Sequence, residues 1–186
     1  MKNTLLLATL AATLAAPAFA EPRLIPAQSE IAFTSRQMGV PVDGKFRKFD
    51  AQVAFDPKNP AAAKIGITID LASVSMGAAE SEAELAKQPW FDTKRFPQAS
   101  FQSTSVKAIG PGKYEVAGKL AIKGTPRDVV VPVTLAQAGG TTTAIGAFTM
   151  KRLDFKIGDG EWADTSMVAN DVQVKFKLAL SGVNPL

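Results

Sequence analysis

The fold is decided by a stretch of alternating residues, YEVAGKLAIKGTPRDVVVPVTL at positions 114–135. The residues spaced by two are Tyr114, Val116, Gly118, Leu120 and Ile122, then Val129, Val131, Val133 and Leu135. Between the two runs, Gly124-Thr125-Pro126 is typical of a turn. Apolar residues at every second position, bounded by glycine and proline, indicate half-buried antiparallel strands. We therefore predict two consecutive strands here, each with one face in a core.

The same alternation recurs on both sides of this stretch. The other alternating segments are 31–34, 52–55, 65–71, 101–105, 145–150 and 172–180. Turn residues separate them, among them the runs at 56–60, 110–112 and 139–140. Eight or so strands joined by short turns predict an all-β fold, a sandwich or a barrel.

One stretch departs from this pattern. Residues 76–87 are rich in Ala and Glu, which predicts one short helix. Ser75 or Ser81 would cap it and Pro89 would end it.

Two predicted loops carry large aromatic residues outside the alternation. The first, residues 88–97, contains Trp90 and Phe91, and the second, residues 155–162, begins at Phe155 and ends at Trp162. Two glycines in the second segment predict a mobile loop or turn. Aromatic side chains on loops either cap the core or cover a bound ligand, and the sequence leaves both possibilities open.

The chain contains no Cys and no His. Disulfides are therefore impossible, and zinc or copper sites built on thiolate or imidazole are excluded. Catalysis by Ser–His, Cys–His or a histidine base is excluded too. The formal charge of +4 is dispersed, which argues against nucleic-acid binding. We expect no metal, no covalent cofactor and no catalytic residues, although an enzyme that uses carboxylates, Lys and Tyr114 remains conceivable.

The first twenty residues are typical of a secretory signal peptide. Lys2 precedes an apolar run at 5–16, and Ala18-Phe19-Ala20 forms a small-x-small cleavage site. No Cys lies at that site, so lipoprotein anchoring is not indicated. We expect a periplasmic protein that begins at Glu21, with residues 21–186 forming one domain.

Residues 91–106, FDTKRFPQASFQSTSV, resemble the signature of the YceI-like family: an aromatic-Asp segment, then Phe-Pro, then Phe-x-Ser-Thr-x-Val. Residues 114–126 resemble the family's G-x-L-x-I-x-G hairpin, and residues 46–49, 55–57 and 69–74 also fit. The resemblance covers nearly all of residues 21–186. It implies an antiparallel lipocalin-like β-barrel of about eight strands, which holds a polyisoprenoid or a similar amphiphilic lipid in its interior.

This chain departs from the family where histidines are common. Gln28, Gln37 and Glu84 stand at those positions, so a family role that depends on imidazole is not expected here. Residues 35–44, SRQMGVPVDG, resemble a subgroup associated with membrane-bound b-type cytochromes that handle quinones. That resemblance implies a ubiquinone-like ligand and a cytochrome partner.

For such a ligand we predict an apolar interior and a polar head-group contact at the mouth. The residues expected to contact the lipid are Phe33, Phe55, Ile67, Ile69, Trp90, Phe91, Phe101, Leu120, Phe148, Phe155, Trp162 and Phe176. Val131 and Val174 should face the same interior. Arg36, Gln37 and Arg152 are the candidates for the head group.

Three classes of function remain open. They are a carrier of an isoprenoid lipid or quinone, an interaction module on a membrane enzyme with a barrel filled by its own side chains, and a carboxylate-based enzyme. If the protein oligomerises, a dimer is the expected form.

Overall fold

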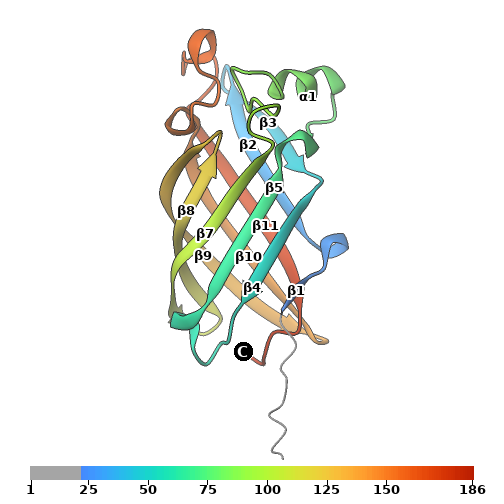
Figure 1. Ribbon diagram of the computed structural model, residues 1–186, viewed down its shortest axis with the longest axis vertical. Coiled ribbons are helices and arrows are strands. Elements are labelled where there is room, and N and C mark those ends of the chain that lie inside the picture. Colours follow the sequence, from blue (N-terminus) through green and yellow to red (C-terminus); the bar gives the residue numbers. More distant parts are fainter. Residues whose placement is uncertain (1–21) are drawn as a thin grey trace, which may run out of the picture.

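A closed ring of antiparallel strands makes up most of residues 22–186, the part of the chain that this computed structural model describes (Figure 1). The expected signal peptide and its cleavage site before Glu21 lie outside the described residues. The strands are β1 Arg23–Leu24, β2 Glu30–Gln37, β3 Val40–Phe46, β4 Phe49–Ala54, β5 Lys64–Asp70, β6 Val74–Ser75, β7 Gln98–Gly110, β8 Lys113–Ile122, β9 Thr125–Ala138, β10 Thr141–Lys151 and β11 Asp171–Ser181.

The sheet order is β1-β4-β5-β7-β8-β9-β10-β11-β2-β3-β6, and a further pairing of β1 with β11 closes it. β1 and β2 pair with opposite ends of β11, at Leu24↔Leu180 and Phe33↔Val174. They form one line interrupted by a 3-10 turn at Pro26–Gln28. β3 and β4 are likewise separated by two residues only, and the two-residue β6 continues the line of β5 after a 3-10 turn at Leu71–Ser73. The architecture is therefore the expected all-β antiparallel barrel of eight strands.

The strand β3 is the element that the alternation did not reveal. Pro41 and Gly44 interrupt its pattern, and both residues are disfavoured inside strands. β3 is nevertheless paired with β2 from Gln37↔Val40 to Ile31↔Phe46. Tertiary pairing thus overrides a weak local propensity.

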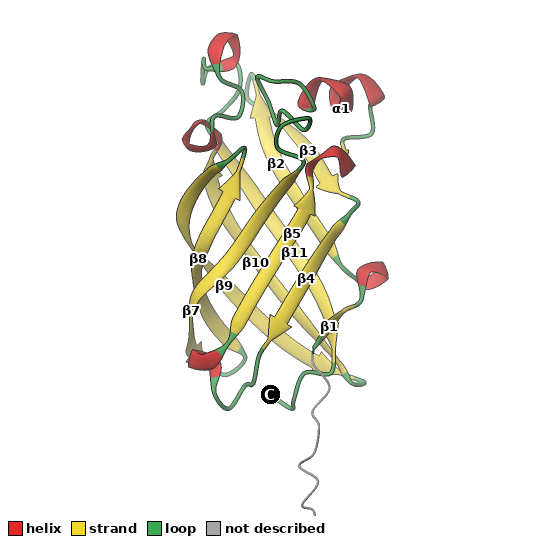
Figure 2. Cartoon of the chain, viewed as in Figure 1, coloured by secondary structure: helices red, strands yellow, loops and turns green. Residues whose placement is uncertain are grey.

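The α-helix α1, Ala79–Leu85, is shorter than predicted (Figure 2). Neither predicted serine caps it, because Ser75 lies in β6 and Ser81 lies within the helix. Instead, the Glu82 carboxylate accepts hydrogen bonds from the backbone N–H of Met76 (2.9 Å) and Gly77 (3.3 Å). These bonds fix the turn before the helix, where Gly77 has a φ of +78°.

The two ends of the barrel differ (Figures 1 and 2). One end carries α1, the loop 88–97 and the segment 152–170, with its 3-10 turns at Arg152–Phe155 and Gly160–Trp162. The other end carries the short β7–β8 and β9–β10 turns, a 3-10 turn at Pro60–Ala62 and the C-terminus. Within residues 22–186, no helix has the length and apolar character needed to cross a membrane.

Candidate ligand-binding cavity

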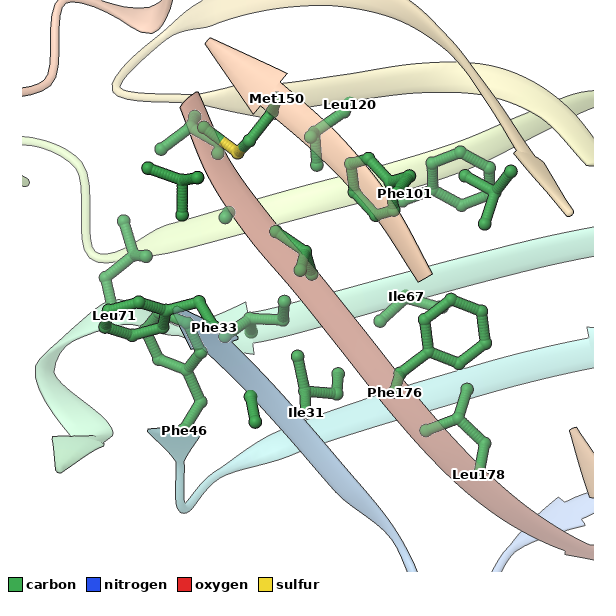
Figure 3. A pocket seen from close by; sticks show the side chains of 18 of the residues that line it. Ile31, Phe33, Phe46, Ile67, Leu71, Phe101, Leu120, Met150, Phe176 and Leu178 are labelled. Carbon is green, nitrogen blue, oxygen red and sulfur yellow. The ribbon is translucent and has the colours of Figure 1, made fainter. Parts of the chain in front are cut away.

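A cavity of about 560 Å³ occupies the barrel interior. Strand alternation turns the aliphatic and aromatic side chains of successive strands inward. Figure 3 shows Ile31 and Phe33 from β2, Ile67 from β5 and Phe176 from β11 within this interior. Phe33, Ile67 and Phe176 are only half-buried, because they face open volume rather than one another. The volume lies within the range of small-molecule and cofactor sites, about 300–1,000 Å³.

The structure brings most of the predicted lipid-contacting residues to this cavity. Those that line it are Phe33, Phe55, Ile67, Ile69, Trp90, Phe91, Phe101, Leu120, Phe148, Trp162 and Phe176, together with Val131 and Val174. Period-two alternation placed the strand residues correctly.

Phe155 does not line the cavity, so this prediction is wrong. Its side chain is 2% exposed and belongs to a buried cluster that includes Trp90, Ile157 and Val168. β10 ends at Lys151, and the following 3-10 turn directs Phe155 into this packed layer.

Phe46 is a cavity residue that was not predicted from the sequence. This residue lines the cavity and packs on Phe33 and Phe91, at ring-centroid distances of 5.7 and 6.1 Å. It ends the unpredicted strand β3, which is why the alternation did not identify it.

Three glycines make room for the aromatic rings of the cavity wall. Gly44, Gly118 and Gly146 each lie beneath a phenylalanine ring, those of Phe33, Phe101 and Phe176 respectively. In all three, a Cβ would overlap the ring. The rings therefore lie along the sheet instead of projecting across the cavity.

The cavity meets solvent at the end that carries α1. The exposed side chains among its lining residues are those of Gln37, Glu80, Ser81 and Trp162. Gln37 ends β2, Glu80 and Ser81 belong to α1, and Trp162 ends the Gly160–Trp162 turn. We refer to these four residues and the half-buried Glu84 as the opening.

The opposite end is closed by buried side chains. Tyr114, Leu180 and Val183 line the cavity there and are all buried. The Gln137 amide holds the C-terminal tail across this end: its Nε2 donates to the carbonyls of Val183 (3.2 Å) and Asn184 (3.3 Å). Within the described residues, the cavity is therefore open at the end of the barrel that carries α1 and closed at the opposite end.

Arg152 is not a rim residue that is free to contact a head group, and this prediction is wrong. It lines the cavity, but it is 2% exposed. Its guanidinium donates to five backbone carbonyls, those of Ile157, Gly158, Trp162, Val168 and Ala169, at 2.5 to 3.1 Å. Burial lowers the pKa of Arg152 from its ordinary value. The residue fixes the segment 157–169 against the barrel.

The other two predicted head-group residues lie in different places. Gln37 lines the opening, as expected for that position. Arg36 does not line the cavity; it is exposed and its Nη1 donates to the Gly39 carbonyl at 3.1 Å.

A second buried cation, Lys123, joins the two loops at this end. Its Nζ donates to the carbonyls of Lys156 (2.7 Å) and Pro89 (3.3 Å) and lies 3.7 Å from an Asp159 carboxylate oxygen. Both buried cations at this end are thus committed to loop carbonyls.

The two tryptophans lie together at the opening. The ring centroids of Trp90 and Trp162 are 5.4 Å apart and the rings are inclined by 45°. Trp90 is 7% exposed, and its buried Nε1 has no hydrogen-bond acceptor in the described residues, whereas Trp162 is 38% exposed. Both rings line the cavity.

The polar chemistry of the site is sparse. The described residues contain no group of three His, Cys, Asp or Glu side chains that could hold a metal. Glu80 and Glu84 are the carboxylates that line the cavity. The neighbouring Glu82 turns away to the backbone, and its hydrogen bond from Met76 lowers the pKa of its carboxyl, aided by Ser75 and Arg47. The arrangement is suited to holding an apolar molecule with a small polar group at the mouth.

Comparison with known proteins agrees with the fold described above. Residues 23–180 match the model of the YceI-like domain. BcnA of Burkholderia cenocepacia is 46% identical, with a TM-score of 0.81, over 84% of this chain and 98% of BcnA.

Two more distant structures share the fold alone. The YceI protein of Campylobacter jejuni is 23% identical with a TM-score of 0.70, over 77% of this chain and 86% of that one. A polyisoprenoid binding domain from Saccharophagus degradans is 16% identical with a TM-score of 0.71, over 87% and 98%.

Curated relatives align over a shorter part. UPF0312 proteins of Photorhabdus laumondii and Yersinia pestis are each 38% identical over 96 residues, which is 52% of this chain. The chain spans about half the length of the curated relatives it matches.

Proposed function

The chain belongs to the YceI-like family, and from this premise we propose that it is a binding and carrier protein for a long isoprenoid lipid or isoprenoid quinone held inside the barrel. The observation that carries the proposal is the apolar cavity of about 560 Å³, which meets solvent at the end of the barrel that carries α1. Inward-facing aromatic residues such as Phe33 and Phe176 remain half-exposed. A bound apolar chain would remove that surface from water.

The energetics of burial support a ligand with a long apolar chain, such as an isoprenoid. Each buried methylene contributes about 0.8 kcal/mol, so a five-carbon unit contributes roughly 3–4 kcal/mol before ordering costs. Several units would approach the practical limit of affinity. Cavity depth, set by the closed end at Tyr114 and Val183, would therefore select chain length better than affinity does.

The cellular location and the membrane partner are proposed from the sequence alone. A periplasmic location, reached through the signal peptide, is part of the proposal. A ubiquinone-like ligand and a membrane b-type cytochrome partner are its more specific form, and both rest on the resemblance of residues 35–44 to one subgroup.

The two other functions fit the molecule less well. A docking module with a barrel filled by its own side chains would not need an interior cavity of this size. A carboxylate-based enzyme would need converging carboxylates in an enclosed polar cleft, whereas Glu80 is exposed and Glu84 is paired with Lys87.

The test is organic extraction of the purified protein followed by mass spectrometry. We expect close to one apolar isoprenoid molecule per chain, and we expect delipidated protein to take up an isoprenoid of about 20 carbons from detergent. A protein that yields no lipid and takes up none after delipidation would contradict the proposal.

A further inference from the structure

The opening of the cavity carries two carboxylates, those of Glu80 and Glu84. On the basis of the proposed function, we propose that the bound lipid carries an uncharged, hydroxyl-bearing head group, as in an isoprenoid alcohol or hydroquinone, and that Glu80 and Glu84 discriminate against phosphate and carboxylate head groups.

The helix α1 presents one face to the cavity. Glu80, Ser81, Glu84 and Leu85 all line it. Glu80 and Glu84 are four residues apart in the helix, so both carboxylates lie on one face. Ser35 and Gln37 of β2 line the cavity as well. The polar side chains that α1 and β2 contribute to the lining are thus two carboxylates, two hydroxyls and one amide.

In the part of the chain that the structure describes, no free cation in the cavity lining offsets the charge of these carboxylates. Among residues 22–186, Arg152 is the only Lys or Arg that lines it, and its guanidinium is occupied by five backbone carbonyls. Lys123 is occupied by two carbonyls and Asp159. Lys87 pairs with Glu84 from outside the lining.

An anionic head group at this mouth would therefore meet like charge without a free Lys or Arg side chain in the lining to neutralise it. Phosphate sites in proteins supply Arg, Lys or backbone N–H donors instead. A hydroxyl head group avoids this repulsion. It can donate to the carboxylate of Glu80 or Glu84 or to the Gln37 amide oxygen, and it can accept from serine.

The unpaired donor on Trp90 is a further group that a hydroxyl-bearing head group could satisfy. Its Nε1 is buried at this end of the barrel and has no acceptor in the described residues. A buried unpaired N–H is costly, and a hydroxyl oxygen of the ligand nearby would offer it an acceptor.

The experiment compares three ligands that share one isoprenoid chain: geranylgeraniol, geranylgeranyl phosphate and geranylgeranoic acid. Delipidated protein is titrated near neutral pH by equilibrium dialysis with mass-spectrometric detection. We expect the alcohol to bind at least about tenfold more tightly than the phosphate, with the acid between them. The double variant Glu80→Gln/Glu84→Gln should narrow the alcohol-to-phosphate ratio by about threefold or more.

The control is Glu115→Gln, which removes a carboxylate from the outward face of β8 and should leave the ratio unchanged. Melting curves establish that all variants are folded. Phosphate binding as tight as alcohol binding in the unaltered protein, or a ratio that the double variant does not change, would overturn this inference alone. Failure of all three ligands to bind would overturn the proposed function itself.

Discussion

The ring of Phe33 lies directly over Gly44, its paired residue on the neighbouring strand. A Cβ at residue 44 would lie 2.3 Å from Cζ of that ring, and its three nearest atoms would all belong to Phe33. The same ring also packs on Phe46 and lines the cavity. The width of the cavity near its mouth therefore depends on the absence of a side chain at residue 44.

We expect Gly44→Ala to push the Phe33 ring into the cavity. Overpacking of this kind costs about 1–3 kcal/mol of unfolding free energy, and it should also weaken uptake of a 20-carbon isoprenoid. The measurements are urea denaturation and ligand titration. Adding Phe33→Leu should restore most of the lost stability, because a smaller side chain no longer meets the new methyl group.

Gly110→Ala is the matched control for this prediction. The nearest atom to a Cβ there is the Lys113 side-chain Cδ at 4.0 Å, so stability and binding should hardly change. If both variants behave alike, the Phe33–Gly44 contact does not control the cavity.

Arg152 is expected to be the most important polar residue for stability at the open end. Replacing Arg152 by Met leaves five carbonyls without their donor. Removing one partner of buried charge-assisted bonds costs about 3–5 kcal/mol. The neighbouring exposed Lys151→Met should change the unfolding free energy by less than about 0.5 kcal/mol. Similar denaturation midpoints for the two variants would contradict the role assigned to Arg152.

The strands and the inner wall could be predicted from the sequence because period-two alternation specifies which face of a strand is buried. Phe101 and Leu120, for example, lie in the wall as expected. β3 was not predicted because Pro41 and Gly44 are disfavoured inside strands. Its extended conformation depends on pairing with β2.

The candidate site was less predictable. Nothing local distinguishes a solvated Arg from Arg152, because its acceptors are contributed by residues 157–169 after the chain has turned back. The role of α1 at the mouth also depends on tertiary placement. The i, i+4 spacing of Glu80 and Glu84 was visible in the sequence, but the cavity beneath them was not.

The stability of the turn before α1 should depend on pH through Glu82. Its pKa is lowered chiefly by the hydrogen bond from the Met76 backbone, with Ser75 and Arg47 adding to the effect. A carboxyl whose pKa is lower in the folded state stabilises that state above its unfolded pKa, and this contribution is lost as the pH falls through the folded pKa. The difference in unfolding free energy between the unaltered protein and Glu82→Gln should therefore be present at about pH 7 and shrink toward about pH 3.

Glu115→Gln serves as the comparison, since its carboxyl lies on the outward face of β8. A Glu82→Gln difference that stays constant across this pH range would show that the ionised carboxylate is not what stabilises the turn.

Cavity depth is expected to set the preferred chain length. Ala144 faces the cavity from β10 toward its closed end. Ala144→Phe should occupy part of the deep half and shift preference toward shorter isoprenoids, so that a 20-carbon alcohol loses more affinity than a 10-carbon one. Ala147→Phe, on the exposed face of the same strand, should leave the preference unchanged. Equal losses for both chain lengths in Ala144→Phe would mean that the ligand does not reach this depth.

Tryptophan emission should report on ligand binding, because both tryptophans of the chain line the cavity at its open end. Trp162 is partly exposed and packs on the buried Trp90. An isoprenoid that enters the mouth should exclude water from Trp162 and shift its emission to shorter wavelength, and a quinone head group should quench both rings.

Trp162→Phe should remove most of the wavelength shift, since Trp90 is already buried. The double variant Trp90→Phe/Trp162→Phe should abolish the signal and also weaken binding measured by dialysis, because both rings contribute wall surface at the mouth. If the emission of the unaltered protein never responds to ligand and the double variant binds with unchanged affinity, the two tryptophans serve only to cap the core, and the ligand does not pass between them.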